Sequence, residues 1–287
     1  MPNVSQMLKS LAKEQGVDLE IVQKDYAISY LLAAIAQTTS LGEKIVLKGG
    51  TALKKLYYPH YRFSEDLDYS TLKLGVLPKG DELLQVAVTR MADLLQERGP
   101  FEVQAEPLTL HMPHPGKQMA YTVRVRFPDQ RQALCRLKVE ITVDEPVLLK
   151  VRERPILHGF GEKFETSVPG YVLEEIVAEK LRALLQSRQK LAKRGWGASR
   201  VCRDYYDLWY ILRREKLTDV PDLFVQKCKV RKVAFHSHDE LVSPELIETA
   251  RREWDQQLSP FLVDALNANK VLSEVQPFIS ALFHAGS

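Results

Sequence analysis

Two segments in the first half of the chain alternate apolar and polar side chains, and no segment after residue 172 does so. One is Tyr121 to Phe127 and the other is Arg136 to Val143. Such alternation is typical of strands with one buried face. Helical spacing is found near 19–37 and 81–98, and again near 172–193, 203–214, 243–257 and 271–284. We therefore predict an α+β part over residues 1–169 and a helical part over 170–287, with the boundary at Pro169-Gly170.

The composition is that of an ordinary folded protein with little net charge. In 287 residues, 45% are hydrophobic and 27% charged, and Lys plus Arg exceed Asp plus Glu by only 40 − 37 = 3. A nucleic-acid surface would therefore have to come from local clusters. The three cysteines, Cys135, Cys202 and Cys228, are far apart and form no CxxC motif, which indicates unpaired thiols in a reducing compartment and no zinc site. No apolar run is long enough to span a bilayer, so we expect a cytoplasmic protein without a membrane partner.

A short apolar strand, Ile45 to Leu47, ends at Gly49-Gly50, and a segment with helical spacing begins at Thr51. Glycine lets the backbone approach a ligand closely, and the amides at a helix start can donate to phosphate oxygens. The strand, glycine pair and helix therefore predict a phosphate-binding turn. The alternative is a tight turn without a ligand.

Asp66 and Asp68 are two residues apart, so on a strand they share one face, while Leu67 and Tyr69 point to the other. Such a pair can hold a divalent cation, which neutralises the repulsion between the carboxylates. A neighbouring antiparallel strand could bring Glu140 beside them, and three carboxylates could hold two magnesium ions. The alternatives are a solvated acidic turn and an exposed strand with Arg–Glu pairs.

Lys180 lies inside the apolar stripe of the segment 172–186. It either extends to the edge of that stripe or enters a site where an anion compensates its charge. Asp204 and Asp207 share one side of the next helical segment, and they could face Lys180. Alternatively, Asp204 caps that helix and Asp207 stabilises its first turn.

The stretch QSRQKLAKRGWGASRVCR, residues 186–203, contains six Lys or Arg residues, no acid, and one tryptophan between two glycines. Such a stretch combines phosphate contacts with an aromatic ring for base stacking, although a solvated surface is the alternative. A second basic cluster, residues 227–232, gives weaker support. The predicted RNA contacts are Arg188, Lys190, Lys193, Arg194, Trp196 and Arg200.

Three segments, KGGTALKKLYYPHYRFSEDLD, LEEIVAEKLRALL and RDYYDLW, together resemble the AbiEii/AbiGii toxin family of nucleotidyltransferases, which includes the MenT toxins of mycobacteria. The resemblance covers roughly residues 20–215 in order and spacing. It implies a DNA polymerase β-like nucleotidyltransferase core with a mixed or antiparallel sheet, followed by a helical domain that contributes an active-site lysine and aspartate. Here Gly50-Thr51 replaces the usual Gly-Ser of that fold.

The resemblance also implies roles for single residues. Gly49, Gly50 and Thr51 would hold the triphosphate, while Asp66 and Asp68 would bind Mg²⁺ or Mn²⁺. Lys180 would contact nucleotide phosphates, and either Asp204 or Asp207 would supply the downstream acid. Ser64 matches a position at which some relatives are silenced by phosphorylation.

The family activity is the transfer of a nucleoside monophosphate from an NTP to RNA, in the mycobacterial branch to the 3′ end of tRNA, which blocks translation. A companion antitoxin is also implied. Two alternatives remain open at this point. The acceptor could be a protein side chain or a small molecule, or the chain could be a non-catalytic relative that binds RNA or a partner.

Overall fold

The structure is a computed structural model that describes residues 3–75, 77–109, 117–198 and 200–284. It divides into two compact units, Met1–Tyr171 and Val172–Ser287. The boundary expected at Pro169-Gly170 lies beside this division. Each unit is described by itself below.

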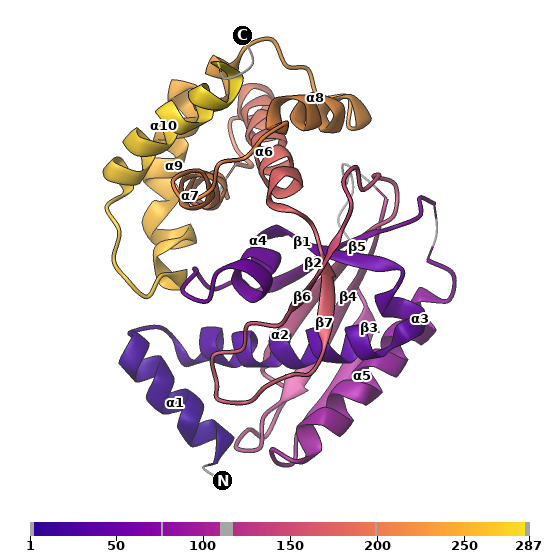
Figure 1. The fold of residues 1–287 in the computed structure, drawn as a ribbon. Helices are drawn as coiled ribbons and strands as arrows, with labels where there is room; N and C mark the ends of the chain where they lie inside the picture. Colours follow the sequence, from indigo (N-terminus) through magenta and orange to yellow (C-terminus); the bar gives the residue numbers. More distant parts are fainter. Residues whose placement is uncertain (1–2, 76, 110–116, 199, 285–287) are drawn as a thin grey trace. The chain divides into compact units, whose positions relative to one another are not determined.

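The first unit is built on a mixed sheet of seven strands in the order β3-β4-β5-β2-β1-β7-β6 (Figure 1). The two central strands are β1 (Ile45–Lys48) and β2 (Asp66–Thr71). On one side follow β5 (Cys135–Thr142), β4 (Gln118–Arg126) and β3 (Glu102–Pro107), and on the other side β7 (Ser167–Gly170) and β6 (Arg152–Pro155). The pairs β2/β5 and β1/β7 are parallel and the other neighbours are antiparallel. The expected α+β class with a mixed sheet is therefore confirmed.

Helices α1 (Val4–Gln15), α2 (Leu19–Gln37), α3 (Thr39–Gly42) and α5 (Gly80–Gln96) accompany this sheet. The helix α2 is buried on nearly all sides because it contacts α1 and α5 as well as strands β5 and β7. Its bounds agree with the predicted helix at 19–37. A short helical run, α4 (Gly49–Ala52) continued by the π-helical turn η1 (Leu53–Tyr57), connects β1 to the segment before β2.

The two alternating segments form β4 and β5 as predicted, and the helix predicted over 81–98 is α5. The strands β3 and β6 have mostly exposed side chains and lie at the two edges of the sheet. They therefore lack the buried alternating face that reveals a strand in a sequence.

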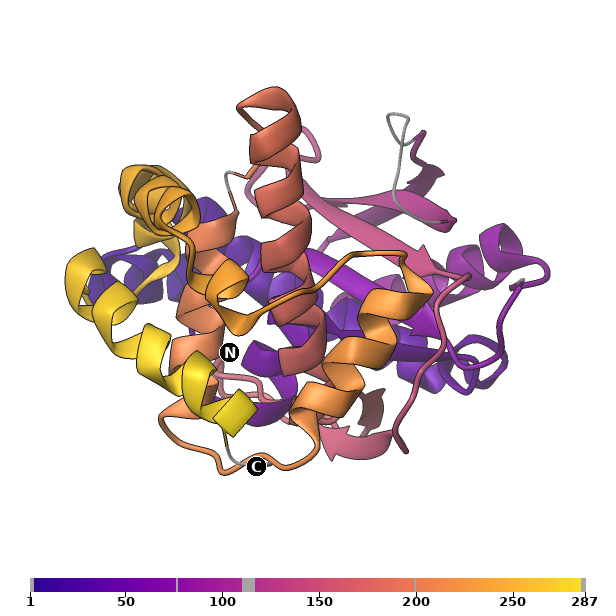
Figure 2. The same ribbon diagram turned by 90° about the horizontal axis from the view of Figure 1, so that it is seen from above.

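The second unit contains α6 (Leu173–Arg194), α7 (Val201–Leu212), α8 (Val220–Val230), α9 (Pro244–Gln257) and α10 (Ala268–His284). Two 3₁₀ turns, η2 (His238–Val242) and η3 (Ser259–Phe261), connect parts of them. Within this unit α6 lies between α7 and α8 (Figures 1 and 2). Four helices match the predicted ones, and α8 was not predicted.

All three cysteines are free, as expected, and all three are buried. In the part of the chain that the structure describes, no helix combines the length and apolarity that crossing a bilayer requires.

Candidate active site

The glycine pair forms the sharp connection between β1 and the helical run that begins at Gly49. Gly49 has φ +71°, a left-handed backbone conformation that side chains other than glycine disfavour. A Cβ atom at this position would lie 2.9 Å from Oδ2 of Asp68. At Gly50 a Cβ would lie 2.7 Å from Nη2 of Arg62 and 3.2 Å from Oγ of Ser64. A side chain at Gly49 would thus be strained and would displace the Asp68 carboxylate, whereas a side chain at Gly50 would displace the end of the Arg62 side chain.

The register of the central strands places the acidic pair beside this turn. In the antiparallel pair of β1 and β2, Lys48 is the partner of Asp68, so Gly49 follows directly. Asp66 and Asp68 are half-buried, whereas the intervening Leu67 and the following Tyr69 are buried. The two carboxylates thus share one face of β2, as the alternation predicted.

Glu140 is the in-register partner of Asp68 on β5. Glu140 therefore lies beside the acidic pair as expected, but β2 and β5 run parallel, not antiparallel. The sequence could not show the direction because the two strands are far apart in the chain. In this structure Oε2 of Glu140 lies 2.9 Å from Nζ of Lys138, which forms an ion pair with it.

The chemistry of Asp66, Asp68 and Glu140 suits a hard divalent cation, because all three supply carboxylate oxygens. Among the described residues, however, no three His, Cys, Asp or Glu side chains are arranged as a formed metal site. The donor types fit a divalent metal, and Lys138 pairs with only one of the two carboxylate oxygens of Glu140.

Thr51 ties the glycine turn to β2. Its side chain is buried, with 1% exposed. The hydroxyl donates to the carbonyl oxygen of Asp66 and lies 2.9 Å from Oγ of Ser64. In this conformation the hydroxyl positions the two segments, so a contact of Thr51 with phosphate would involve its backbone amide.

Arg62 is a site residue that sequence reasoning missed. It is 4% exposed, donates from Nη1 to the carbonyl of Phe63 at 3.1 Å, and, like Ser64, lies beside Gly50. A basic residue two positions before Ser64, flanked by two aromatic residues in the motif YRFSEDLD, was the available signal. A buried guanidinium next to a serine hydroxyl creates a positive environment around that hydroxyl.

In the helical unit, Lys180 on α6 contacts two carboxylates of α7. Its Nζ lies 2.7 Å from Oδ1 of Asp204 and 2.8 Å from Oδ2 of Asp207. The side chain of Asp207 is fully buried, whereas 13% of Asp204 and 16% of Lys180 are exposed. The anion that compensates Lys180 is therefore supplied by the protein, and the three charged groups sum to −1.

The interpretation of Asp204 as a helix cap is wrong. The helix α7 begins at Val201, its N-cap residue is Arg200, and Asp204 is already inside the first turn. Because Asp204 and Asp207 are three residues apart on one helix, both reach the same lysine.

The basic stretch is mostly helical, because α6 continues to Arg194 and ends at Gly195, which is left-handed with φ +74°. Most of the predicted RNA contacts are exposed, namely Lys190, Lys193, Arg194, Arg200 and Trp196, the last with 68% of its surface accessible. Arg188 is half-buried and forms an ion pair with Glu240 at 2.6 Å.

The interpretation of the second basic cluster, residues 227–232, as a nucleic-acid contact is wrong for Lys227. Lys227 is fully buried, and its Nζ lies 2.7 Å from Glu175 and 2.9 Å from Glu179. It stabilises the packing of α8 on α6 and is not available to a nucleic acid.

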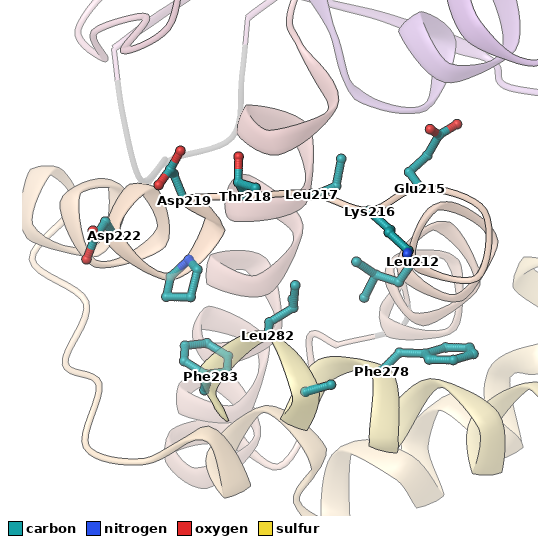
Figure 3. A pocket seen from close by; sticks show the side chains of 12 residues that line it. Leu212, Glu215, Lys216, Leu217, Thr218, Asp219, Asp222, Phe278, Leu282 and Phe283 are labelled. Carbon is teal, nitrogen blue, oxygen red and sulfur yellow. The ribbon is translucent and has the colours of Figure 1, made fainter. Parts of the chain in front are cut away.

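The helical unit also contains a cavity of about 760 Å³ beside α7, α8 and α10. Apolar side chains such as Leu212, Leu282 and Phe283 line it together with carboxylates such as Glu215 and Asp219 (Figure 3). None of the predicted catalytic or nucleotide-binding residues lines this cavity, so it does not belong to the candidate site.

Comparisons with known proteins agree with the residue pattern. The family model described as "Nucleotidyl transferase AbiEii toxin, Type IV TA system" matches residues 30–276. The solved structure of MenT4, a nucleotidyltransferase toxin from Mycobacterium tuberculosis H37Rv, is similar with a TM-score of 0.64 at 23% identity, over 96% of this chain and 89% of that chain. This likeness shows the fold.

A structure of a candidate nucleotidyltransferase from H. pylori matches with a TM-score of 0.49 at 19% identity, over 90% of this chain and 95% of that one. A comparison with curated protein sequences gives no match. Because the family model covers most of the chain, the chain belongs to the AbiEii nucleotidyltransferase toxin family of type IV toxin–antitoxin systems.

Proposed function

We propose that this protein transfers a nucleoside monophosphate from an NTP to RNA, with the 3′ end of tRNA as the acceptor, and thereby blocks translation. The observation that carries the proposal is the approach of Gly49 to the Asp68 carboxylate, with Asp66 on the same strand face and Glu140 in register. This arrangement puts backbone amides and carboxylates side by side. An NTP with its divalent cation needs both groups together.

The reaction is a displacement at the α-phosphate. An RNA hydroxyl oxygen forms a bond to the α-phosphorus, the bond from that phosphorus to the bridging oxygen breaks, and pyrophosphate leaves, while the hydroxyl proton passes to solvent. The amides at residues 49–51 would orient the triphosphate, and Asp66 and Asp68 would hold a divalent cation, Mg²⁺ or Mn²⁺. When bound, such a cation lowers the pKa of a hydroxyl and stabilises charge on the phosphoryl oxygens.

For the helical unit, we favour Asp204 over Asp207 as the acid that takes part in the reaction. Asp207 is completely buried under the lysine, whereas Asp204 has accessible surface. In this proposal Asp207 positions Lys180, and Lys180 contacts nucleotide phosphates after Asp204 releases it. Because Asp204 and Asp207 are both carboxylates, release of one of them from Lys180 would favour the binding of a phosphate.

Recognition of RNA is assigned to the exposed end of α6 and the turn that follows. Lys193, Arg194 and Trp196 are exposed, and the Arg194 guanidinium lies 5.8 Å from the centre of the Trp196 ring. Cations and an accessible aromatic ring together suit a phosphate backbone with unstacked bases. This feature favours RNA over a protein side chain or a small molecule as acceptor.

The surroundings of Ser64 support the proposal that it is a regulatory site. Its Oγ lies 2.9 Å from the Thr51 hydroxyl and near Arg62. A phosphate on this oxygen would pair with Arg62, break the contact with Thr51 and add negative charge two residues before Asp66. We propose that this modification inactivates the enzyme. The family further suggests a cognate antitoxin as partner and a cytoplasmic location.

The test is incubation of the purified protein with each α-labelled NTP, Mg²⁺ or Mn²⁺, total tRNA and cell extract. We expect label on tRNA, lost in Asp66→Ala and retained in Asp93→Ala, which changes an exposed aspartate of α5. Label on protein would support an AMPylation-like transfer instead. No transfer from any nucleotide would contradict both and would favour a non-catalytic binding protein.

A second comparison tests the regulation. Ser64→Glu is expected to abolish transfer, whereas Ser64→Ala keeps most of it, because alanine leaves the Thr51 bond to β2 in place. An active Ser64→Glu protein would refute the switch without affecting the proposed reaction.

A further inference from the structure

Lys48 is the last residue of β1 and lies directly before the glycine turn. Its backbone is extended, with φ −138° and ψ −173°, so the alternation of the strand continues through it. In the antiparallel pair of β1 and β2 it is the direct partner of Asp68. Side chains of directly opposite residues lie on the same face of a sheet. The side chain of Lys48 is therefore on the face of β2 that carries the two aspartates.

The ring of Tyr171 holds the ammonium group of Lys48 over this face. The strand β7 runs parallel to β1, with Gly170 as the partner of Leu47, so the two residues that follow are neighbours as well. Nζ of Lys48 lies 5.8 Å from the centre of the Tyr171 ring, within the range of a cation–π contact. The phenol donates to Oγ of Ser70 on β2 at 3.0 Å, which fixes the ring.

A row of side chains thus crosses neighbouring strands on one face of the sheet. It consists of Glu140 on β5, Asp68 on β2, Lys48 on β1 and Tyr171 directly after β7. The carboxylates of this row attract cations, whereas the ammonium group of Lys48 attracts anionic oxygens. A phosphoryl group that binds together with a divalent cation needs both kinds of charge side by side.

Two other basic residues near the acidic pair are less suited to contact a phosphate. Nζ of Lys138 lies 2.9 Å from Oε2 of Glu140. Arg62 is 4% exposed, and its Nη1 donates to the carbonyl oxygen of Phe63. Lys48 is half-buried, so part of its side chain is accessible while part is shielded from water. A charge that is partly shielded from water interacts more strongly with an anion than a fully exposed one.

We propose that Lys48 is a catalytic residue whose ammonium group binds a non-bridging oxygen of the α-phosphate of the NTP. The inference rests on the proposed transfer reaction and specifies a contact within the same site. The α-phosphate is favoured over the β- and γ-phosphates because the transferred phosphoryl group has to lie at the cation held by Asp66 and Asp68, and Asp68 is the direct neighbour of Lys48.

The role of Lys48 in the reaction is electrostatic. While the RNA hydroxyl oxygen forms its bond to the α-phosphorus and pyrophosphate leaves, the ammonium group stabilises the negative charge on the non-bridging oxygen. No proton passes to or from Lys48.

The first test measures binding without chemistry. The ligands are the analogues of ATP, GTP, CTP and UTP with a methylene group between the α- and β-phosphorus atoms, which cannot transfer a nucleotide, and calorimetry with Mg²⁺ reports their affinity. Lys48→Met should weaken binding roughly tenfold to a hundredfold, the usual effect of losing a hydrogen bond to a charged group. Its control, Lys44→Met, changes an exposed lysine directly before the same strand and should leave the affinity unchanged.

The second test measures transfer to tRNA. Lys48→Met should lower kcat roughly hundredfold to thousandfold, as for other single donors that stabilise charge in a transition state. Lys48→Arg should restore part of the rate because it keeps the charge. Sulfur in place of one non-bridging α-oxygen should slow the unmodified protein for one of the two diastereomers. This slowing should be several-fold smaller in Lys48→Met, because the contact that sulfur weakens is already absent.

These measurements separate the inference from the proposed reaction. If no RNA is labelled but Lys48→Met binds the analogues more weakly than Lys44→Met, the reaction is refuted and the phosphate contact stands. If the two variants bind equally well, the contact is refuted whether or not RNA is labelled. An unchanged sulfur effect in Lys48→Met would show that Lys48 acts only through the structure. If thermal unfolding shows that Lys48→Met does not fold, Lys48→Arg decides, and an unchanged sulfur effect in that variant refutes the contact.

Discussion

Gly49→Ala, compared with Gly16→Ala, separates backbone strain from the contact between the glycine turn and Asp68. Both glycines belong to the α+β unit and have left-handed backbones, with φ +71° and +64°. A Cβ at Gly16 meets nothing within 4 Å, whereas a Cβ at Gly49 lies 2.9 Å from Oδ2 of Asp68. The two variants therefore have the same backbone strain, and only Gly49→Ala places its added Cβ against the Asp68 carboxylate.

The strain of a non-glycine residue in this conformation is about 1–2 kcal/mol, so both variants should lower the free energy of unfolding by that amount. For a unit of this size that corresponds to a fall in Tm of roughly 2–8 °C. Only Gly49→Ala must also displace the Asp68 carboxylate, by about half an ångström, to restore an ordinary contact of 3.4 Å. We expect its transfer rate to fall roughly tenfold to a hundredfold, since small displacements of positioned groups have effects of this size.

Thermal unfolding and transfer of labelled nucleotide to tRNA, measured on both variants and the unmodified protein, provide the comparison. Similar Tm values with a selective loss of activity in Gly49→Ala are the expected result. If Gly49→Ala transfers nucleotide as fast as Gly16→Ala, the position of Asp68 does not control the reaction, and its assignment to the site is wrong.

Two further predictions concern charged groups outside the glycine turn. Lys227→Ala should destabilise the helical unit by roughly 3–5 kcal/mol because it removes the buried cation that pairs with Glu175 and Glu179. Lys229→Ala, at an exposed position of the same helix, should change stability little. Equal effects of the two variants in chemical denaturation would contradict this prediction. Hydrogen bonds from Lys9 and Ser5 hold the pKa of Asp129 below its ordinary value, so this contact stabilises the protein above about pH 4 and is lost as the pH falls through the lowered pKa. Asp129→Asn should therefore flatten the acid limb of the stability profile, and an unchanged limb would exclude the contact as its source.

The sequence was sufficient for features that depend on local periodicity. The strand β5 buries alternate residues such as Leu137 and Val139, so its pattern is visible without knowledge of its neighbours. The edge strand β6 has no buried face and left no comparable signal. The direction of pairing between β2 and β5 depends on how the chain crosses between them, which no local pattern records.

For the candidate site, the sequence identified groups but not their partners. Lys180 was conspicuous because a charge inside an apolar stripe needs compensation, and the structure supplies it from α7. The sequence did not reveal that Arg62 and Lys227 are enclosed. Both are basic residues in segments with other polar residues, and both are buried. Whether a cation is exposed or enclosed is decided by contacts between distant segments, such as that of α8 with α6, and these contacts are absent from a local pattern.

The DxD segment has to keep the glycine turn and β2 in register and also, in the proposed function, to hold a divalent cation. These two requirements limit each other. Asp68 must stay close to Gly49, and Thr51 must stay bonded to the carbonyl of Asp66, for the turn and the strand to keep their register. The same carboxylates must remain half-buried and accessible if they are to hold a divalent cation. Ser64 lies where these requirements meet, because its hydroxyl contacts Thr51 and its neighbour Arg62 contacts Gly50. One phosphate there would act on the turn, the strand and the local charge together, which makes it an efficient position for control.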